Sequence, residues 1–357
     1  MSDVSIEVVP FDAVREVLGR SEPGASLLLG NGFSIACDPR YSYRALREHA
    51  EDLLPKVSLA LLDRLDTDNL EQVMQIVEDA RWVAEQFDQP GFDRDLSSAH
   101  AETCLALVQA LAADHLTSPS QIDRDRDRSS HAVAFLSLFE RVFTTNYDLL
   151  LYWTMMKDAG HRDQGYNYRD GFRRAEGEQF GEFDETVDVN VFYLHGALHL
   201  YEHQSADQTS DDQTSDGQTS ARKHVRTGNR GLVKIVKSTL ERGDFPLFVA
   251  GGRPEQKLET IHRSPYLTRC FDAFSRVDGP LVIFGWSLGD SDRHLLKALA
   301  SNADLGTVYL SFYGDPDSPS NLRLRATVAE LCEEAVELRG QPLEVMLFPS
   351  QEAGVWG

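Results

Sequence analysis

The stretch "LLLGNGFSIA", residues 27–36, decides how the fold begins. A short apolar run ends in Gly30-Asn31-Gly32, and Phe33 and Ser34 then open a predicted helix. A strand, a glycine turn and a helix start form a common phosphate-binding arrangement, because the free N–H groups at a helix N-terminus carry partial positive charge. A tight strand-to-helix turn that holds no ligand has the same sequence pattern.

Further along the chain, apolar runs that predict strands alternate with stretches of helical period. Near-continuous apolar strands separated by helices are typical of parallel sheets, so the predicted fold class is α/β with a doubly wound parallel sheet. The runs are "RVFTTN" (141–146), "VNVFYLHG" (189–196), "FPLFVAGG" (245–252), "PLVIFGWSLG" (280–289), "TVYLSFYG" (307–314) and "LEVMLF" (343–348).

A helical block interrupts the predicted sheet, because "NLEQVMQIVEDARWV" and "AETCLALVQALAADHL" repeat apolar residues on one helix face. We expect residues 1–43 and 141–357 to build the sheet domain. Residues 44–140 then form an inserted helical subdomain, which is a cap or an oligomer surface. Residues 205–221 repeat Asp-Gln-Thr-Ser with small changes and predict a disordered loop, since they offer little apolar surface to bury.

The overall composition excludes several classes of protein. The chain of 357 residues has 35 basic and 57 acidic side chains, and its net charge of −22 repels nucleic acid and anionic membranes. No signal-peptide pattern and no apolar run of membrane-spanning length is present, so we expect a cytoplasmic protein. No metal site is predicted, because the dispersed cysteines form no CxxC pair; they are Cys37, Cys104, Cys270 and Cys332.

Polar residues directly follow four of the predicted strands. Ligands of doubly wound sheets bind beyond the carboxyl ends of the strands, so we expect these four segments to meet at one site. The segments are Gly30-Asn31-Gly32-Phe33-Ser34, Thr144-Thr145-Asn146-Tyr147-Asp148, His195-Gly196 and Gly285-Trp286-Ser287-Leu288-Gly289-Asp290.

Three of these side chains suit chemistry on a ribose. Asn146 can orient a water molecule or a ribose hydroxyl, whereas Asp148 can accept a hydrogen bond from a hydroxyl or simply cap the next helix. His195 ends an apolar strand, where it is either a structural histidine or a base that works near neutral pH. His199 and His203 continue a four-residue spacing from His195, but no predicted helix aligns the three as metal ligands.

The two glycine-containing turns are each open to a structural explanation. The first turn is not the dinucleotide fingerprint G-x-G-x-x-G, because Ile35 stands where the third glycine would fall. In the last turn Ser287, Asp290 and Asp292 either cap the following helix or bind a ribose or an adenine by hydrogen bonds.

The order Gly-x-Gly-x-Ser, Thr-x-Asn-x-Asp, His-Gly and Gly-x-Ser-Leu resembles the sirtuin superfamily. It is most similar to bacterial sirtuin-like proteins, including a domain family of unknown function with "LLLGNGFS", "TTNYD" and "LHG" in this order. The resemblance implies a Rossmann-like sheet that binds NAD, with His195 as the catalytic base and Asn146 and Asp148 facing the nicotinamide ribose. The residues that it implies for NAD binding are Gly30, Asn31, Gly32, Phe33, Ser34, Thr145, Gly285, Ser287 and Asp290.

The resemblance implies an NAD+ glycohydrolase that releases nicotinamide and ADP-ribose, with NAD as its substrate and no metal. Bacterial proteins that resemble this pattern are often NAD-consuming effectors in antiphage defence. A non-catalytic module that senses NAD or ADP-ribose and signals to a partner protein is the alternative. A protein deacylase is a third hypothesis. It would be free of zinc, because the four-cysteine zinc module of lysine deacylases is absent and the Asp-Gln-Thr-Ser repeat stands in its place. Each of these three functions is compatible with a homo-oligomer.

Overall fold

A seven-stranded parallel sheet forms the centre of the molecule. The computed structural model describes residues 6–87, 90–123, 127–158, 168–173, 180–204, 219–224 and 231–357. The sheet order is β1-β12-β11-β10-β2-β3-β6. Its strands are β1 (Glu7–Val8), β2 (Ser26–Leu29), β3 (Arg141–Thr144), β6 (Val191–Tyr193), β10 (Gly279–Phe284), β11 (Leu305–Phe312) and β12 (Val345–Pro349).

Strand β2 lies in the middle of the sheet, and the chain leaves it in two directions. It first moves outward through β3 to β6, and it later returns to the other side of β2 with β10, β11 and β12. Without the edge strand β1, this is the 3-2-1-4-5-6 order of Rossmann sheets, in which ligands bind where the order reverses. The predicted α/β fold class is therefore confirmed, and the reversal falls between β2 and β10.

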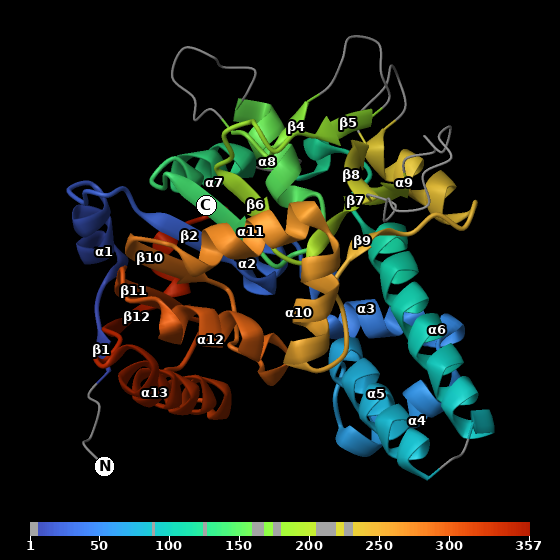
Figure 1. The fold of residues 1–357 in the computed structure, drawn as a ribbon. Coiled ribbons are helices and arrows are strands. Elements are labelled where there is room, and N and C mark those ends of the chain that lie inside the picture. Colours follow the sequence, from blue (N-terminus) through green and yellow to red (C-terminus); the bar gives the residue numbers. More distant parts are fainter. Residues whose placement is uncertain are drawn as a thin grey trace, which may run out of the picture.

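Helices cover the sheet and build the insertion between β2 and β3. Helices are the only regular elements among the described residues from α2 to α7, and Figure 1 shows α4, α5 and α6 projecting away from the sheet. No helix of the described residues is long and apolar enough to cross a membrane. The helices are α1 (Phe11–Leu18), α2 (Asn31–Cys37), α3 (Tyr43–Ala50), α4 (Lys56–Leu65), α5 (Leu70–Gln86), α6 (Pro90–Asp114), α7 (Arg128–Leu136), α8 (Leu150–Asp158), α9 (Leu232–Leu240), α10 (Pro254–Arg263), α11 (Pro265–Ser275), α12 (Arg293–Ser301) and α13 (Pro319–Arg339).

A second, antiparallel sheet was not predicted from the sequence. Its five strands are paired in the order β4-β5-β8-β7-β9. The run at 245–252, expected in the parallel sheet, contributes β9 to this second sheet instead, so that expectation was wrong. Its strands are β4 (Phe172–Arg173), β5 (Phe180–Phe183), β7 (Gly196–Gln204), β8 (Thr219–His224) and β9 (Pro246–Phe248).

The predicted disordered loop overlaps this second sheet at one end. Residues 205–218 lie outside the described residues. Residues 219–221, which were assigned to the loop, begin strand β8 and pair with β7. The small polar residues there were misleading, because backbone pairing with the neighbouring strand, and not side-chain hydrophobicity, defines a strand end.

Candidate functional site

The glycine turns after β2 and β10 pack directly against each other at the reversal point of the sheet. A Cβ atom on Gly32 would lie 2.5 Å from the Gly285 Cα, and one on Gly30 would lie 2.6 Å from the Gly285 carbonyl oxygen. The Gly30 N–H donates to the Phe284 oxygen at 2.9 Å and the Gly32 N–H to the Gly285 oxygen at 2.7 Å. These two N–H groups are therefore unavailable to a phosphate, contrary to the role expected for them.

Behind this turn, Ser34, Asn146 and Asp148 form a buried hydrogen-bond network. The Ser34 hydroxyl donates to Asp148 Oδ2, and the Asn146 amide donates to Ser34 Oγ at 3.1 Å and to the Gly30 oxygen at 3.0 Å. Asp148 Oδ1 accepts from the Leu150 N–H, so Asp148 also caps α8. Burial raises the pKa of Asp148, although the hydrogen bond from Ser34 opposes this. The network fixes Asn146 and leaves its Oδ1 without a donor among the described residues.

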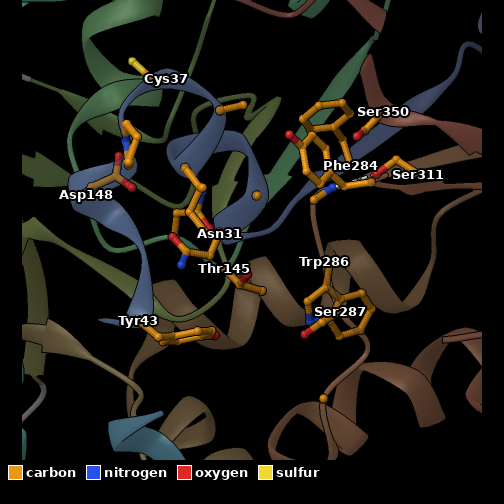
Figure 2. Close-up of a pocket in the computed structure, with 18 of the residues that line it drawn as sticks. Asn31, Cys37, Tyr43, Thr145, Asp148, Phe284, Trp286, Ser287, Ser311 and Ser350 are labelled. Carbon is orange, nitrogen blue, oxygen red and sulfur yellow. Dashed lines mark hydrogen bonds between the residues drawn. The ribbon is translucent and has the colours of Figure 1, made fainter. Parts of the chain in front are cut away.

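A cavity of about 1030 Å³ opens beyond the carboxyl ends of the strands, at the reversal point. The helical insertion closes part of it, since Tyr43, Glu71 and Leu107 also line its wall. Figure 2 shows Tyr43 and Trp286 on different sides of this cavity, with Thr145 and Asn31 between them in the view. The sequence-predicted site residues on the wall are Asn31, Gly32, Thr145, Asn146, Asp148, His195, Gly285 and Ser287.

Four other residues that were predicted to bind NAD lie off the cavity wall. Phe33 is buried against Trp356, with 4.8 Å between the ring centroids, so it belongs to the core. Asp290 is exposed and begins the short 3₁₀ helix Asp290–Asp292. Gly30 and Ser34 act behind the wall through the contacts described above. Local sequence could not separate these residues from their neighbours, because burial depends on the packing of the two turns.

The charges on the wall are mostly negative. Its charged side chains in the described residues are Asp68, Glu71, Asp148, Asp292 and Arg128. The Arg128 guanidinium donates to the Ala36 and Cys37 carbonyl oxygens at 2.9 and 2.7 Å, at the C-terminal end of α2. A cationic group is therefore favoured near the carboxylates, and an anionic group is favoured only near Arg128.

The His195-Gly196 pair lies at the junction of the two sheets. His195 lies between the end of β6 and the start of β7. Its carbonyl oxygen accepts a hydrogen bond from the Val249 N–H at 3.0 Å. Its ring lines the cavity and is only 2% exposed. Gly196 has φ +77°, and a Cβ atom there would lie 1.9 Å from the Leu247 oxygen. Glycine is thus needed because strand β9 passes directly over this position.

Gly196→Ala is expected to destabilise the protein by several kcal/mol. An L side chain is strained at a positive φ, and the added methyl group would also clash with the backbone of β9. Urea unfolding measures the change, and Gly243→Ala is the control, because Gly243 has a positive φ of +87° but a Cβ atom there would have no heavy atom within 4 Å. Equal losses in the two variants would show that strain alone, and not the clash, sets the cost.

A buried ion cluster surrounds the His195 ring. Lys257 of α10, with a side chain only 1% exposed, contacts Asp292 Oδ1 at 2.9 Å and Glu71 Oε2 at 3.1 Å. Glu71 also accepts from the Tyr147 hydroxyl at 3.0 Å. Burial alone would lower the pKa of Lys257, but the two carboxylates outweigh it and raise that pKa. The cluster joins the helical insertion to the sheet domain, because Glu71 comes from α5.

His294 of α12 completes the surroundings of His195. The Nε2 atoms of the two imidazoles lie 3.2 Å apart, and Asp292 Oδ1 lies 3.9 Å from His195 Nε2. Burial lowers the pKa of His195 well below its usual value, with Asp292 opposing the shift, and lowers the pKa of His294 to about 4. Both rings are therefore neutral near pH 7.

His195, Asp292 and His294 could together hold a metal ion, because one ligand atom of each lies within 4.8 Å of the others. The residues fit such an ion poorly, since the Lys257 ammonium already bonds the Asp292 oxygen that faces the group. Sequence reasoning noted Asp292 and missed Lys257 and His294. The spacing Asp-x-His after a strand was an available signal for His294, whereas nothing near Lys257 in the sequence indicated its burial.

Fold and site together define a Rossmann-like α/β protein with a nucleotide-sized cavity at the reversal point of its sheet. The family model described as "Domain of unknown function (DUF4917)" matches residues 27–356, and the chain belongs to this family. A search of curated proteins found no match. The family match covers all four motifs and assigns none of them a role.

Proposed function

We propose that this protein is an NAD+ glycohydrolase, which hydrolyses the bond between nicotinamide and ribose. The observation that carries the proposal is that the His195 imidazole and the Asn146 amide line one cavity at the reversal point of a Rossmann-like sheet. Dinucleotides bind at this point in Rossmann folds. The sirtuin-like order of the motifs supports the same class of ligand.

The size and charge of the cavity are compatible with NAD+. Its volume of about 1030 Å³ lies at the upper end of the roughly 300–1,000 Å³ typical of small-molecule sites. The positively charged nicotinamide ring would be favoured near Glu71 and Asp292, beside His195. The pyrophosphate would be favoured toward Arg128, which is the one basic Lys or Arg side chain on the wall among the described residues.

The proposed reaction replaces the C–N bond to nicotinamide by a C–O bond from water. The electron pair of the breaking bond goes to the pyridinium nitrogen, which leaves neutral nicotinamide. His195 would take a proton from a ribose hydroxyl, and Asn146 Oδ1 would orient the attacking water. As the new C–O bond forms, the water would give one proton to the ribose oxygen, and the His195 imidazolium would then release its proton to solvent, so that the overall reaction releases one proton. The oxocarbenium-like transition state is positively charged at the ribose, so the nearby carboxylates would stabilise it.

A non-catalytic sensing module is the second candidate, and one observation favours it. The Asn146 amide group already donates to Gly30 and Ser34, as expected for a residue whose task is to hold the two loops together. Such a protein would bind NAD or ADP-ribose and signal to a partner. A zinc-free deacylase, a role in antiphage defence, homo-oligomer formation and a location in the cytoplasm rest on the sequence alone.

The test is to incubate the purified protein with NAD+ and to follow nicotinamide by chromatography and NAD+ binding by calorimetry. Nicotinamide release without added peptide supports the glycohydrolase. Binding of NAD+ or ADP-ribose without release supports the sensing module. Release that depends on an acyl-lysine peptide supports the deacylase, and absence of both binding and release contradicts all three.

A further inference from the structure

The Asp292 carboxylate is held in place at both of its oxygen atoms. Oδ1 accepts from the Lys257 ammonium at 2.9 Å, and Oδ2 accepts from the Trp286 indole N–H at 3.1 Å. The loop that carries it bends at Leu288, which has φ +55°, a conformation that residues other than glycine adopt rarely. A backbone strained in this way beside a cavity indicates that the position of the loop matters to the site.

The His195 ring is fixed by neighbours on several elements. Its centroid lies 5.3 Å from that of His294 and 6.4 Å from that of Tyr147, and these rings are inclined to it by 30° and 28°. The Nε2 atom faces His294 Nε2 at 3.2 Å, and it is also the ring nitrogen nearest Asp292. The Nδ1 atom of His195 forms no hydrogen bond with a described residue, so it is the nitrogen left for a ligand in the cavity.

We propose that Asp292, His294 and Lys257 form a positioning relay, which holds His195 as a base at Nδ1 and stabilises the imidazolium that it becomes. This inference rests on the proposed function for the identity of the proton donor, a ribose hydroxyl. His294, Asp292 and Lys257 are positioning residues, because they act on the substrate only through His195.

Either ring could donate in the contact between the two Nε2 atoms, and the relay requires one of the two arrangements, in which the buried His294 Nδ1 carries a hydrogen without a partner among the described residues. His195 carries its hydrogen on Nε2 and donates it to His294 Nε2, which requires the hydrogen of His294 to be on Nδ1. When His195 Nδ1 takes a proton from the substrate, Nε2 keeps its hydrogen. The new positive charge then lies 3.9 Å from the Asp292 carboxylate.

Lys257 helps to keep the pKa of His195 low. The Asp292 carboxylate lies 3.9 Å from the His195 ring, and Lys257 links it to Glu71, which accepts from the Tyr147 hydroxyl. The Asp292 carboxylate favours the protonated form of His195, which cannot act as a base. The Lys257 ammonium contacts both carboxylates and lowers the pKa of His195, as burial does more strongly.

The test uses Asp292→Asn, with Asp290→Asn as the matched control, because Asp290 is an exposed carboxylate two residues earlier in the same turn. Histidine labelled with ¹³C reports the pKa and tautomer of His195 by NMR, and a His195→Gln sample assigns its signal. We expect the pKa of His195 to fall in Asp292→Asn and to be unchanged in Asp290→Asn. An unchanged value in Asp292→Asn, or a hydrogen on Nδ1 in the wild type, would overturn the relay.

Kinetics give the second readout when the wild type releases nicotinamide. Asp292→Asn should lower kcat by about tenfold, the equivalent of one pKa unit, with KM little changed. His294→Ala should lower kcat similarly, and His294→Gln should restore part of it, since the Gln oxygen can accept the His195 Nε2–H. A loss that appears only in KM, or no rescue by Gln, would overturn the positioning role.

Two outcomes separate the relay from its alternatives. A wild type that never turns over NAD+ would contradict the proposed function, and the NMR measurement would still decide whether the relay exists. One equivalent of tightly bound zinc that is lost in His294→Ala would overturn the relay, because His195 Nε2 would then be a metal ligand.

Discussion

His195→Ala is expected to lower nicotinamide release by a factor on the order of 10² to 10⁴, the usual effect of removing a general base. NAD+ affinity should change much less, because Arg128, which would face the pyrophosphate, is unaltered. Initial rates of nicotinamide release and calorimetric binding constants measure the two effects separately. His262→Ala is the control, because His262 is exposed on α10 and does not line the cavity.

Stability must be followed in the same experiment. His195 is only 2% exposed and packs against Tyr147 and His294, so its removal leaves a small cavity and an unpaired His294 nitrogen. His195→Gln fills more of that space and is the better test of chemistry. If His195→Gln is folded and releases nicotinamide at the wild-type rate, His195 is not the base, and the sirtuin resemblance then describes the fold alone.

The inner strands of the parallel sheet could be predicted from the sequence because most of their residues are buried, whereas the exposed edge strand β1 was not predicted. Leu27, Leu28 and Leu29 of β2 are 0% exposed, and such continuous apolar runs are visible without any alignment. The antiparallel sheet could not be predicted in this way. Its strand β8, Thr219–His224, is polar and short, and it exists through pairing with β5 and β7, which the local sequence does not record.

The candidate site was predicted in part for a similar reason. Residues directly after apolar strands, such as Asn146 and His195, could be placed at the edge of the sheet because strand ends are visible in the sequence. Lys257 comes from a helix of a different segment and is buried only because Glu71 and Asp292 meet it there. Lys257 is 35 positions from Asp292 and 186 positions from Glu71 in the sequence, so contacts among these three residues leave no local pattern.

The glycines show how one pattern can serve two purposes. Gly30 and Gly32 resemble a phosphate-binding turn, yet their N–H groups donate to the turn after β10 and their missing side chains allow the two backbones to touch. This packing shapes the reversal point, where the cavity opens. The glycines therefore shape the cavity through the packing of the two backbones, and the sequence alone could not distinguish this from direct contact with a ligand.

Lys257→Met is expected to destabilise the protein by about 3–5 kcal/mol near neutral pH. Removing one partner of a buried ion cluster leaves the other charges uncompensated, and that cost exceeds the value of the ion pair itself. Here the change leaves Glu71 and Asp292, which are 16% and 13% exposed, without their shared cation. Urea unfolding measures the loss, with Lys297→Met as the control, because Lys297 is exposed on α12.

The loss should shrink as the pH falls from about 7 to about 4. Burial alone would raise the pKa of Asp292, but the charge of Lys257 and its hydrogen bond hold that pKa well below the usual value. The stabilisation by this carboxylate in the wild type is therefore fully present above the unfolded pKa of about 3.9 and is lost only below it, so this group leaves wild-type stability nearly unchanged between pH 7 and pH 4. In Lys257→Met, burial dominates and the carboxyl group takes up a proton in the folded state, which stabilises the folded variant relative to its unfolded chain. Because only the variant gains stability from this group between pH 7 and pH 4, the difference between the two proteins shrinks in this range.

A second substitution shows whether uncompensated charge causes the loss. Adding Asp292→Asn to Lys257→Met removes one of the two unpaired carboxylates and should recover part of the unfolding free energy, whereas Asp292→Asn alone should destabilise the wild type. If the double variant is less stable than Lys257→Met, the loss comes from the packing of the lysine side chain and not from its charge. If Lys257→Met is as stable as Lys297→Met, the cluster that joins the helical insertion to the sheet contributes nothing to stability.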